Sequence, residues 1–323
     1  MFSNSEPMNK GAGDLIRLGW GSLFAAQAWP QWVDLPRQQV PQARLASGLS
    51  VTFINHASFL IQVDGLNILT DPIYSERASP SQLAGPARVH QPGIAFEDLP
   101  PIDVILVSHN HYDHLDEGTL RRFAAMKEQP LVLSGLGNGA LFEQLGLVRH
   151  QDLDWEQSIE VDGTRFTFTE CRHRSGRGVI DQMKTLWGAF AVHARSGSVY
   201  FAGDSGYSSH FRETGNRHGP FTLALLPIGA YDPRWFMADV HVNPQEAVQA
   251  HLDLRAQRSI AMHFGTFQLT YESFTQPTED LAVAMAESNL SEDEFSVLQP
   301  GDTTLVVPAM TNVNLRAAIA AAK

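Results

Sequence analysis

Short apolar runs separated by polar or glycine-containing breaks begin at about residue 49 and predict β-strands. The Asp64-Gly65 pair between the second and third runs is typical of a tight hairpin turn. The wholly apolar run 103–107 lacks the alternation of a half-exposed strand, which predicts burial on both faces. The predicted strands are 50–55, 58–63, 66–70, 103–107, 131–134, 161–169, 186–192, 198–202, 223–227 and 259–262.

Helices are predicted over residues 115–127 and 244–254. Strands dominate the first half of the chain and then alternate with helices, which favours an α/β fold in which helices cover sheets. Because α/β folds of this size often form one continuous core, we expect a single domain over residues 49–310. The remaining segments are then an N-terminal arm, 1–48, and a C-terminal tail or short helix, 311–323.

The N-terminal arm has little periodicity, but residues 18–32 are apolar and rich in aromatic side chains. This composition favours a docking arm or an interfacial anchor that makes peripheral contact with a membrane. The upstream Lys10 and Arg17 give the segment a weak similarity to a secretory signal, so a cleaved segment stays open. No apolar run reaches about eighteen residues, and we therefore expect no membrane-spanning helix.

Composition and net charge limit the kinds of partner that the protein can bind. The formal net charge of −12 and the lack of a basic stripe disfavour a nucleic-acid partner. The single cysteine, Cys171, excludes an internal disulfide and fits a reducing, cytoplasmic location. Nothing in the pattern specifies an oligomeric state.

Side chains able to bind metals follow four of the predicted buried strands. His109 follows run 103–107 and His173 follows run 161–169; the other two are Asp204 and His263. Because ligands collect where strand ends converge in sheets of this kind, these side chains predict one shared site.

The segment Ser108-His109-Asn110-His111-Tyr112-Asp113-His114 is the strongest of these signals. His109 and His111 are two residues apart, so in an extended segment both side chains can point to the same side. Three imidazoles and one carboxylate within six residues suit borderline divalent metals, above all zinc. A surface histidine cluster is the alternative, but it would not need a carboxylate or a preceding buried strand.

This segment resembles the His-x-His-x-Asp-His signature of the metallo-β-lactamase superfamily. Further segments resemble, in the same order, the N-acylphosphatidylethanolamine-hydrolysing phospholipase D branch of that superfamily. They are NHASFL (55–60), LTDP (69–72), GDSGY (203–207), LPIGAY (226–231) and HFGTF (263–267). The resemblance extends from about residue 49 to residue 270 and implies an αββα sandwich, with two mixed sheets flanked by helices.

The resemblance also implies two divalent metal ions, with Zn²⁺ expected and iron or manganese as alternatives. Its ligand pattern assigns His109, His111 and His173 to one ion, assigns Asp113, His114 and His263 to the other, and makes Asp204 the bridge. The two ions would share a water and lower its pKa, and Asp113 or Asp204 would orient the resulting hydroxide. Without the resemblance, the distal histidines could be structural residues and Asp204 a turn residue.

Supporting roles are expected for residues near these positions. The resemblance places His241 near the substrate, for orientation or leaving-group protonation, although a structural histidine at a helix entry is the alternative. Asp71 could hydrogen-bond a ligand histidine or only form a turn before Pro72. His56, Tyr207 and Arg234 are further candidates for supporting the site or contacting substrate.

We therefore expect a dinuclear metal-dependent phosphodiesterase of the phospholipase D type. Its substrate would be N-acylphosphatidylethanolamine or a related lipid-like phosphodiester. A lactonase or β-lactam hydrolase would use the same site, because loops and not ligands select the substrate. A non-catalytic lipid- or metal-binding protein is the third alternative.

Overall fold

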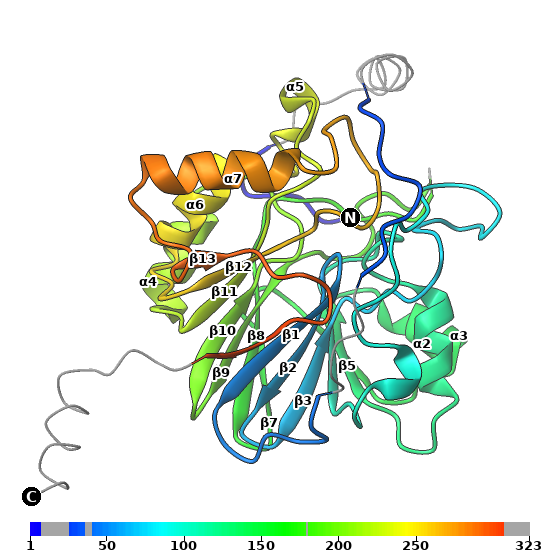
Figure 1. Ribbon diagram of the computed structural model, residues 1–323. Helices are drawn as coiled ribbons and strands as arrows, with labels where there is room; N and C mark the ends of the chain where they lie inside the picture. The colour runs from blue at the N-terminus through cyan, green and yellow to red at the C-terminus, as the bar shows by residue number, and fades with distance from the viewer. Residues whose placement is uncertain (8–25, 36–40, 179, 307–323) are drawn as a thin grey trace, which may run out of the picture.

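Two sheets of seven strands pack face to face in the computed structural model, which describes residues 1–7, 26–35, 41–178 and 180–306 (Figure 1). The first sheet has the order β14 (Thr303–Val306), β1 (Leu49–Asn55), β2 (Ser58–Val63), β3 (Leu66–Thr70), β4 (Val104–Val107), β5 (Leu131–Gly135) and β6 (His150–Leu153). The second has the order β13 (Phe295–Ser296), β12 (Ser259–Met262), β11 (Leu223–Pro227), β10 (Gly197–Phe201), β9 (Ala189–Ala194), β8 (Thr164–Thr169) and β7 (Ser158–Val161). Each sheet combines parallel and antiparallel pairs, so both are mixed.

Helices cover the outer faces of both sheets (Figure 1). On the first sheet lie α2 (Glu117–Ala124) and α3 (Gly139–Leu145), next to the short 3₁₀ turn Phe96–Asp98. On the second lie α4 (His210–His218), α6 (Pro244–Asp253) and α7 (Gln276–Glu287), while the short α5 (Arg234–Met237) projects from the upper edge. The predicted αββα sandwich is confirmed.

The main core fills the space between the sheets. Its inward-facing side chains include the fully buried aromatics Phe53, Phe59, Phe166, Phe190 and Phe201. A second cluster, which includes Phe123 and Phe142, packs between the first sheet and its helices. Strands with apolar neighbours on both faces explain why runs such as VILV show no alternation.

Two predicted strands differ from the structure. The run 161–169 is divided into β7 and β8, because Asp162 (φ 47°) and Gly163 (φ 78°) adopt the left-handed conformation of a hairpin turn. The run 186–192 is displaced: Leu186 to Gly188 are buried but lie outside the ladder, and β9 begins at Ala189. The predicted helix 115–127 begins later, at Glu117, because the Asp116 side chain caps it by accepting from Gly118 N–H.

The described parts of residues 1–48 lie against the sandwich. Asn4 donates to the carbonyl of His173, Gln27 N–H to that of Tyr271, and Val33 N–H to that of Val89. Residues 18–25 of the predicted apolar stretch (18–32) and the predicted tail (311–323) lie outside the described residues. The domain boundaries stay predictions.

Among the described residues, no helix is both long enough and apolar enough to cross a membrane.

The chain segments that follow β4 and β10 touch each other. Gly203, two residues after the end of β10, has φ +56°, and a Cβ there would lie 2.5 Å from Cβ of Ser108, which follows β4. The missing side chain therefore lets the end of the second sheet touch the end of the first. This contact brings Asp204 next to His109.

We predict that Gly203→Ala destabilises the protein more than Gly163→Ala does. Both glycines have positive φ, so both substitutions incur about 1–2 kcal/mol of backbone strain. Only the new Cβ at residue 203 meets other atoms, which adds roughly 1–3 kcal/mol of overpacking, whereas nothing lies within 4 Å at residue 163. Urea unfolding measures the difference, and equal losses would show that the two strand ends are not closely packed.

Candidate metal centre

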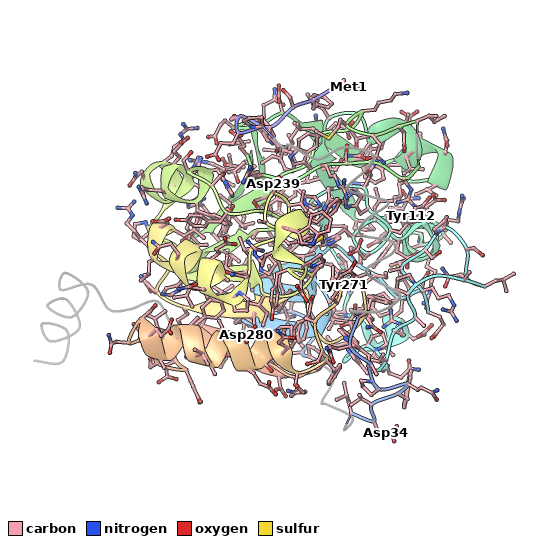
Figure 2. The ribbon with its side chains drawn as sticks, turned by 90° about the horizontal axis from the view of Figure 1, so that it is seen from above. Met1, Asp34, Tyr112, Asp239, Tyr271 and Asp280 are labelled. Carbon is pink, nitrogen blue, oxygen red and sulfur yellow. The ribbon has the colours of Figure 1, made fainter. Side chains whose placement is uncertain are left out.

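Histidine and aspartate side chains from both sheets converge at the upper edge of the sandwich. His109 to His114 follow β4, His173 follows β8, Asp204 follows β10 and His263 follows β12. In the view from above, Tyr112, Asp239 and Tyr271 lie on three sides of the middle of this face (Figure 2). The strand ends therefore bring together all seven residues that the resemblance named as ligands.

The first group consists of His109, His111 and His173. Nε2 of His109 lies 2.8 Å from Nδ1 of His111, and Nε2 of His173 lies 3.2 Å from the same atom. Nitrogen ligands of a tetrahedral zinc lie about 3.3 Å apart, given Zn–N bonds of about 2.0–2.1 Å. The spacing of the three nitrogens is therefore close to that of a metal site.

The second group consists of His56, Asp113, His114 and His263. Its common point is Oδ2 of Asp113, which lies 3.1 Å from Nε2 of His56, 3.3 Å from that of His263 and 3.4 Å from that of His114. His56 is the fourth member and shares this carboxylate, so the structure places it beside the cluster.

Asp204 lies between the two groups. Its Oδ2 is 3.1 Å from Nε2 of His114 and 3.8 Å from Nε2 of both His109 and His173. Its Oδ1 is 3.1 Å from Nε2 of His263. Oδ2 thus faces members of both groups and Oδ1 faces the second, so the carboxylate lies between the groups, where a bridging ligand would lie.

Hydrogen bonds on the far side of each imidazole set the ligand atoms. His114 donates Nδ1–H to Oδ2 of Asp71 at 2.6 Å, and His173 donates Nδ1–H to the Val240 carbonyl at 2.9 Å. Ser108 donates its hydroxyl to Asp71 and can then only accept from Nδ1–H of His109, at 2.9 Å. All three histidines therefore direct Nε2 to the cluster, and in His109 and His173, whose pKa values burial lowers well below the usual range, that nitrogen is unprotonated.

Several of these inward-facing atoms have no hydrogen bond within the described part of the chain. Nε2 of His114 and Oδ1 of Asp204 are buried and lack a donor or acceptor, although other cluster atoms lie close by. Buried polar atoms are rarely left unsatisfied in proteins. Converging lone pairs of this kind fit a divalent cation, and imidazole with carboxylate is a donor set that zinc accepts.

The electrostatics favour the same conclusion. Burial lowers the pKa of His109 and of His173 well below the usual range and that of His111 to about 4, so these imidazoles are neutral and able to bind metal. Burial opposes ionisation of Asp204, but the neighbouring His114 and His263 hold its pKa well below the usual range. Without a metal, the compensating positive charge comes from protons on His114 and His263, whose pKa values are raised despite burial; a divalent cation would replace those protons.

Backbone strain is concentrated in the same place. His56 (φ 46°), Asp71 (φ 29°) and His263 (φ 61°) all adopt the left-handed conformation that non-glycine residues usually avoid. Each costs about 1–3 kcal/mol, and such residues persist where the surroundings fix them. Here Asp71 accepts from Ser108 N–H at 2.7 Å, and His263 N–H donates to the His56 carbonyl at 2.8 Å.

The remaining candidates lie at different distances from the centre. His241 is close: its Nδ1 is 3.9 Å from Oδ2 of Asp204 and has no hydrogen-bond partner in the described chain. Arg234 forms a two-point ion pair with Glu246 and donates to the His241 carbonyl, so it supports His241 from behind. Tyr207 donates its hydroxyl to Asp253 on α6, and the structure therefore engages it outside the cluster.

Sequence reasoning missed two residues that hold the ligands in place. The Ser108 hydroxyl donates to Asp71 and accepts from His109, so it connects these two side chains. In the sequence, only its position beside the histidine segment points to this role. Asn4 donates to the backbone carbonyl of His173 and accepts from its N–H, at 2.8 and 3.1 Å. No local pattern could have linked residues 169 positions apart.

Comparisons with known proteins agree with this geometry. The family model described as a β-lactamase superfamily domain matches residues 66–264. An uncharacterized protein of Mycobacterium tuberculosis is 41% identical over 244 residues, which are 74% of this chain but only 64% of that relative's length. The N-acyl-phosphatidylethanolamine-hydrolyzing phospholipase D 1 of Caenorhabditis elegans is 36% identical over 268 residues, 79% of this chain and 75% of that protein.

One solved structure shows the same fold. A metallo-β-lactamase fold protein from Bacillus subtilis aligns with a TM-score of 0.56 at 18% identity and covers 79% of this chain and 99% of its own.

We predict that Asp204→Asn lowers metal content without unfolding the protein. The amide replaces one of the two oxygens that face the two groups, while the surrounding apolar core stays unchanged. We expect less than the wild-type ratio of zinc to protein by plasma mass spectrometry, and activity lower by at least about 10²-fold, with a wild-type circular dichroism spectrum. A full metal complement and near wild-type activity would contradict the bridging position.

We predict that Asp71→Asn weakens zinc binding by about 10–100-fold. The amide nitrogen cannot accept the hydrogen bonds from Ser108 and His114 that set the ligand nitrogens, so His114 loses the orientation of its Nε2. Competition with a chromogenic chelator measures the affinity. Asp152→Asn is the matched control, because Asp152 also accepts two backbone N–H groups but does so at α3; equal effects of both substitutions would argue against a role for Asp71 in metal binding.

Proposed function

The chain belongs to the β-lactamase superfamily as a metal-dependent hydrolase, and we propose that it uses two metal ions to cleave a phosphodiester. The observation that carries the proposal is the position of Asp204 between the two groups: its Oδ2 faces His109 and His173 of the first group, and its carboxylate also faces His114 and His263 of the second. A single-ion site would not need a carboxylate between two sets of imidazoles.

We assign the residues as follows. His109, His111 and His173 hold the first ion, Asp113, His114 and His263 hold the second, and Asp204 contributes to both. Zinc is the expected metal, with iron or manganese as alternatives for the same donors. When bound, two divalent ions lower the pKa of water towards neutrality and neutralise the negative charge that develops on the substrate oxygen.

The protein's own groups orient the reactants. The ionised carboxylates of Asp113 and Asp204 accept hydrogen bonds from the attacking water and direct its lone pair towards phosphorus. His241 lies beside Asp204 with its Nδ1 unpaired within the described chain. Burial lowers its pKa to about 3, so the neutral imidazole is the form that hydrogen-bonds the leaving oxygen near pH 7.

The proposed substrate is N-acylphosphatidylethanolamine or a related lipid-like phosphodiester. Support comes from the 36% identity with the Caenorhabditis elegans relative, which carries that activity in its name. Water attacks phosphorus, the bond from phosphorus to the N-acylethanolamine oxygen breaks, and that oxygen takes up a proton. The products are phosphatidate and N-acylethanolamine.

We further propose that the N-terminal arm contacts the lipid surface. Trp32 is 44% exposed, and Trp29 packs edge to face on Phe274 in the loop that follows the site. The aromatic side chains of this part of the arm therefore reach the same face of the molecule as the metal centre. Contact with a membrane would bring the lipid substrate close to that face.

Two other functions use the same features. A lactonase or β-lactam hydrolase would need the same ligands, because water attacks a carbonyl carbon in place of phosphorus. A non-catalytic lipid- or metal-binding protein would keep the same ligands without cleaving the molecule that it binds.

We predict that zinc-loaded protein releases phosphatidate and N-acylethanolamine from N-acylphosphatidylethanolamine in mixed micelles. In water enriched in ¹⁸O, mass spectrometry should find the heavy oxygen in phosphatidate and not in N-acylethanolamine, because the attack is on phosphorus. A chelator and the Asp204→Asn variant should both abolish release.

The outcomes separate the three functions. No release from protein that carries two zinc ions, together with opening of a lactone or a chromogenic β-lactam, would replace the phosphodiesterase proposal. If the protein binds two zinc ions but hydrolyses none of these substrates, the non-catalytic binding protein is the function that remains.

A further inference from the structure

Three arginines flank the metal ligand candidate His173, and two of them are fixed by other parts of the protein. Arg172 pairs with Asp239 at 3.0 Å and donates to the carbonyls of Tyr207 and Pro7. Arg177 pairs with Glu117, donates to two backbone carbonyls and stacks 4.0 Å from the ring centre of Tyr112. These two guanidinium groups serve the fold.

Arg174 differs from both. It is partly buried, yet it has neither an ion pair nor a hydrogen bond with any residue that the structure describes. Its nitrogens keep some exposure to solvent, unlike the buried and unpaired Nε of Arg172. A guanidinium has five N–H donors, and burying it without an acceptor is costly.

The position of Arg174 connects it to the metal centre. It follows His173 directly, and its positive charge is close enough to help lower the pKa of both His111 and His173, after burial in each case. No carboxylate of the described chain lies within ion-pair distance of its guanidinium. The cation therefore lies beside the first ligand group without a partner of its own.

We propose that Arg174 is a specificity-determining residue that binds an anionic oxygen of the substrate next to the first ligand group. The planar guanidinium fork matches two oxygens of a phosphodiester, and a substrate anion supplies the acceptor that the protein lacks there. The proposal rests on the proposed phosphodiesterase function and deepens it. Arg174 would make the site favour anionic phosphodiesters over neutral esters that the same ligands could hydrolyse.

The test compares two substrates with the same leaving group. Bis(p-nitrophenyl) phosphate is an anionic diester, and diethyl p-nitrophenyl phosphate is a neutral triester. For Arg174→Gln we expect kcat/KM on the diester to fall by about 10–100-fold, the loss of a hydrogen bond to a charged group, mostly through KM. On the triester we expect a change of less than about 3-fold, because its phosphoryl group carries no net charge.

Two further variants separate charge from structure. Arg174→Lys keeps the charge but not the fork, and it should recover part of the diester activity. Arg195→Gln is the matched control, because Arg195 lies in the β9–β10 turn with an 80% exposed side chain. This variant should have the wild-type kcat/KM on both substrates. All variants should carry the wild-type amount of zinc. Equal losses on diester and triester would overturn the proposal.

A binding measurement distinguishes this proposal from the proposed function. Diethyl phosphate is an unreactive anionic diester, and calorimetry with zinc-loaded protein should show weaker binding to Arg174→Gln than to the wild type and Arg195→Gln. An unchanged Kd would overturn the role of Arg174. Weaker binding to that variant by a protein that hydrolyses no phosphodiester would support anion selectivity and reject the phosphodiesterase function.

Discussion

The burial of two ionised carboxylates among imidazoles is the constraint on which the upper edge of this sandwich depends. Asp204 is almost fully enclosed, and Asp113 has only a small exposed fraction. An ionised carboxylate in such a place destabilises a protein by several kcal/mol unless a positive charge and hydrogen bonds compensate it. The neighbours of Asp204 are mostly imidazoles whose outward nitrogens are already hydrogen-bonded to the protein. Without a metal, protons on His114 and His263 balance the carboxylates, and a divalent cation would take over that role while binding the freed nitrogens.

The residues that surround these carboxylates come from the ends of several strands in both sheets and not from a single segment. Each sheet contributes buried strands that stop at the same edge, and the contact of Gly203 with Ser108 brings the two sheets together there. Asp71 then connects both sides of the first ligand segment, because it accepts from Ser108 and from His114. Left-handed residues at His56, Asp71 and His263 show that this convergence strains the backbone. Destabilisation at the site is offset by the apolar core between the sheets, which lies immediately below.

The sequence predicts the part of this structure that local pattern encodes. Apolar runs locate most strands of the core, and the residue that follows each run identifies His109, Asp204 and His263 as members of one site. The pattern fails where backbone conformation or distant contacts decide. Asp162 and Gly163 divide one predicted strand by adopting the left-handed conformation, and Asn4 reaches His173 across 169 positions. For Arg234 the sequence left open a supporting role or contact with substrate, and it is the pairing with Glu246 on α6 and the bond to the His241 carbonyl that favour support.

The same reasoning explains why ligand geometry and substrate choice are separate properties here. Metal ligands must be neutral imidazoles or ionised carboxylates, so their identity is fixed by the ion and tells little about the molecule attacked. Groups beside the ligands are not bound by that requirement, and their charges can differ between proteins that share the centre. Around His173 the chain neutralises Arg172 and Arg177 with its own carboxylates but leaves Arg174 unpaired among the described residues. A positive charge that the fold does not use is best explained by a negative charge that arrives with the substrate.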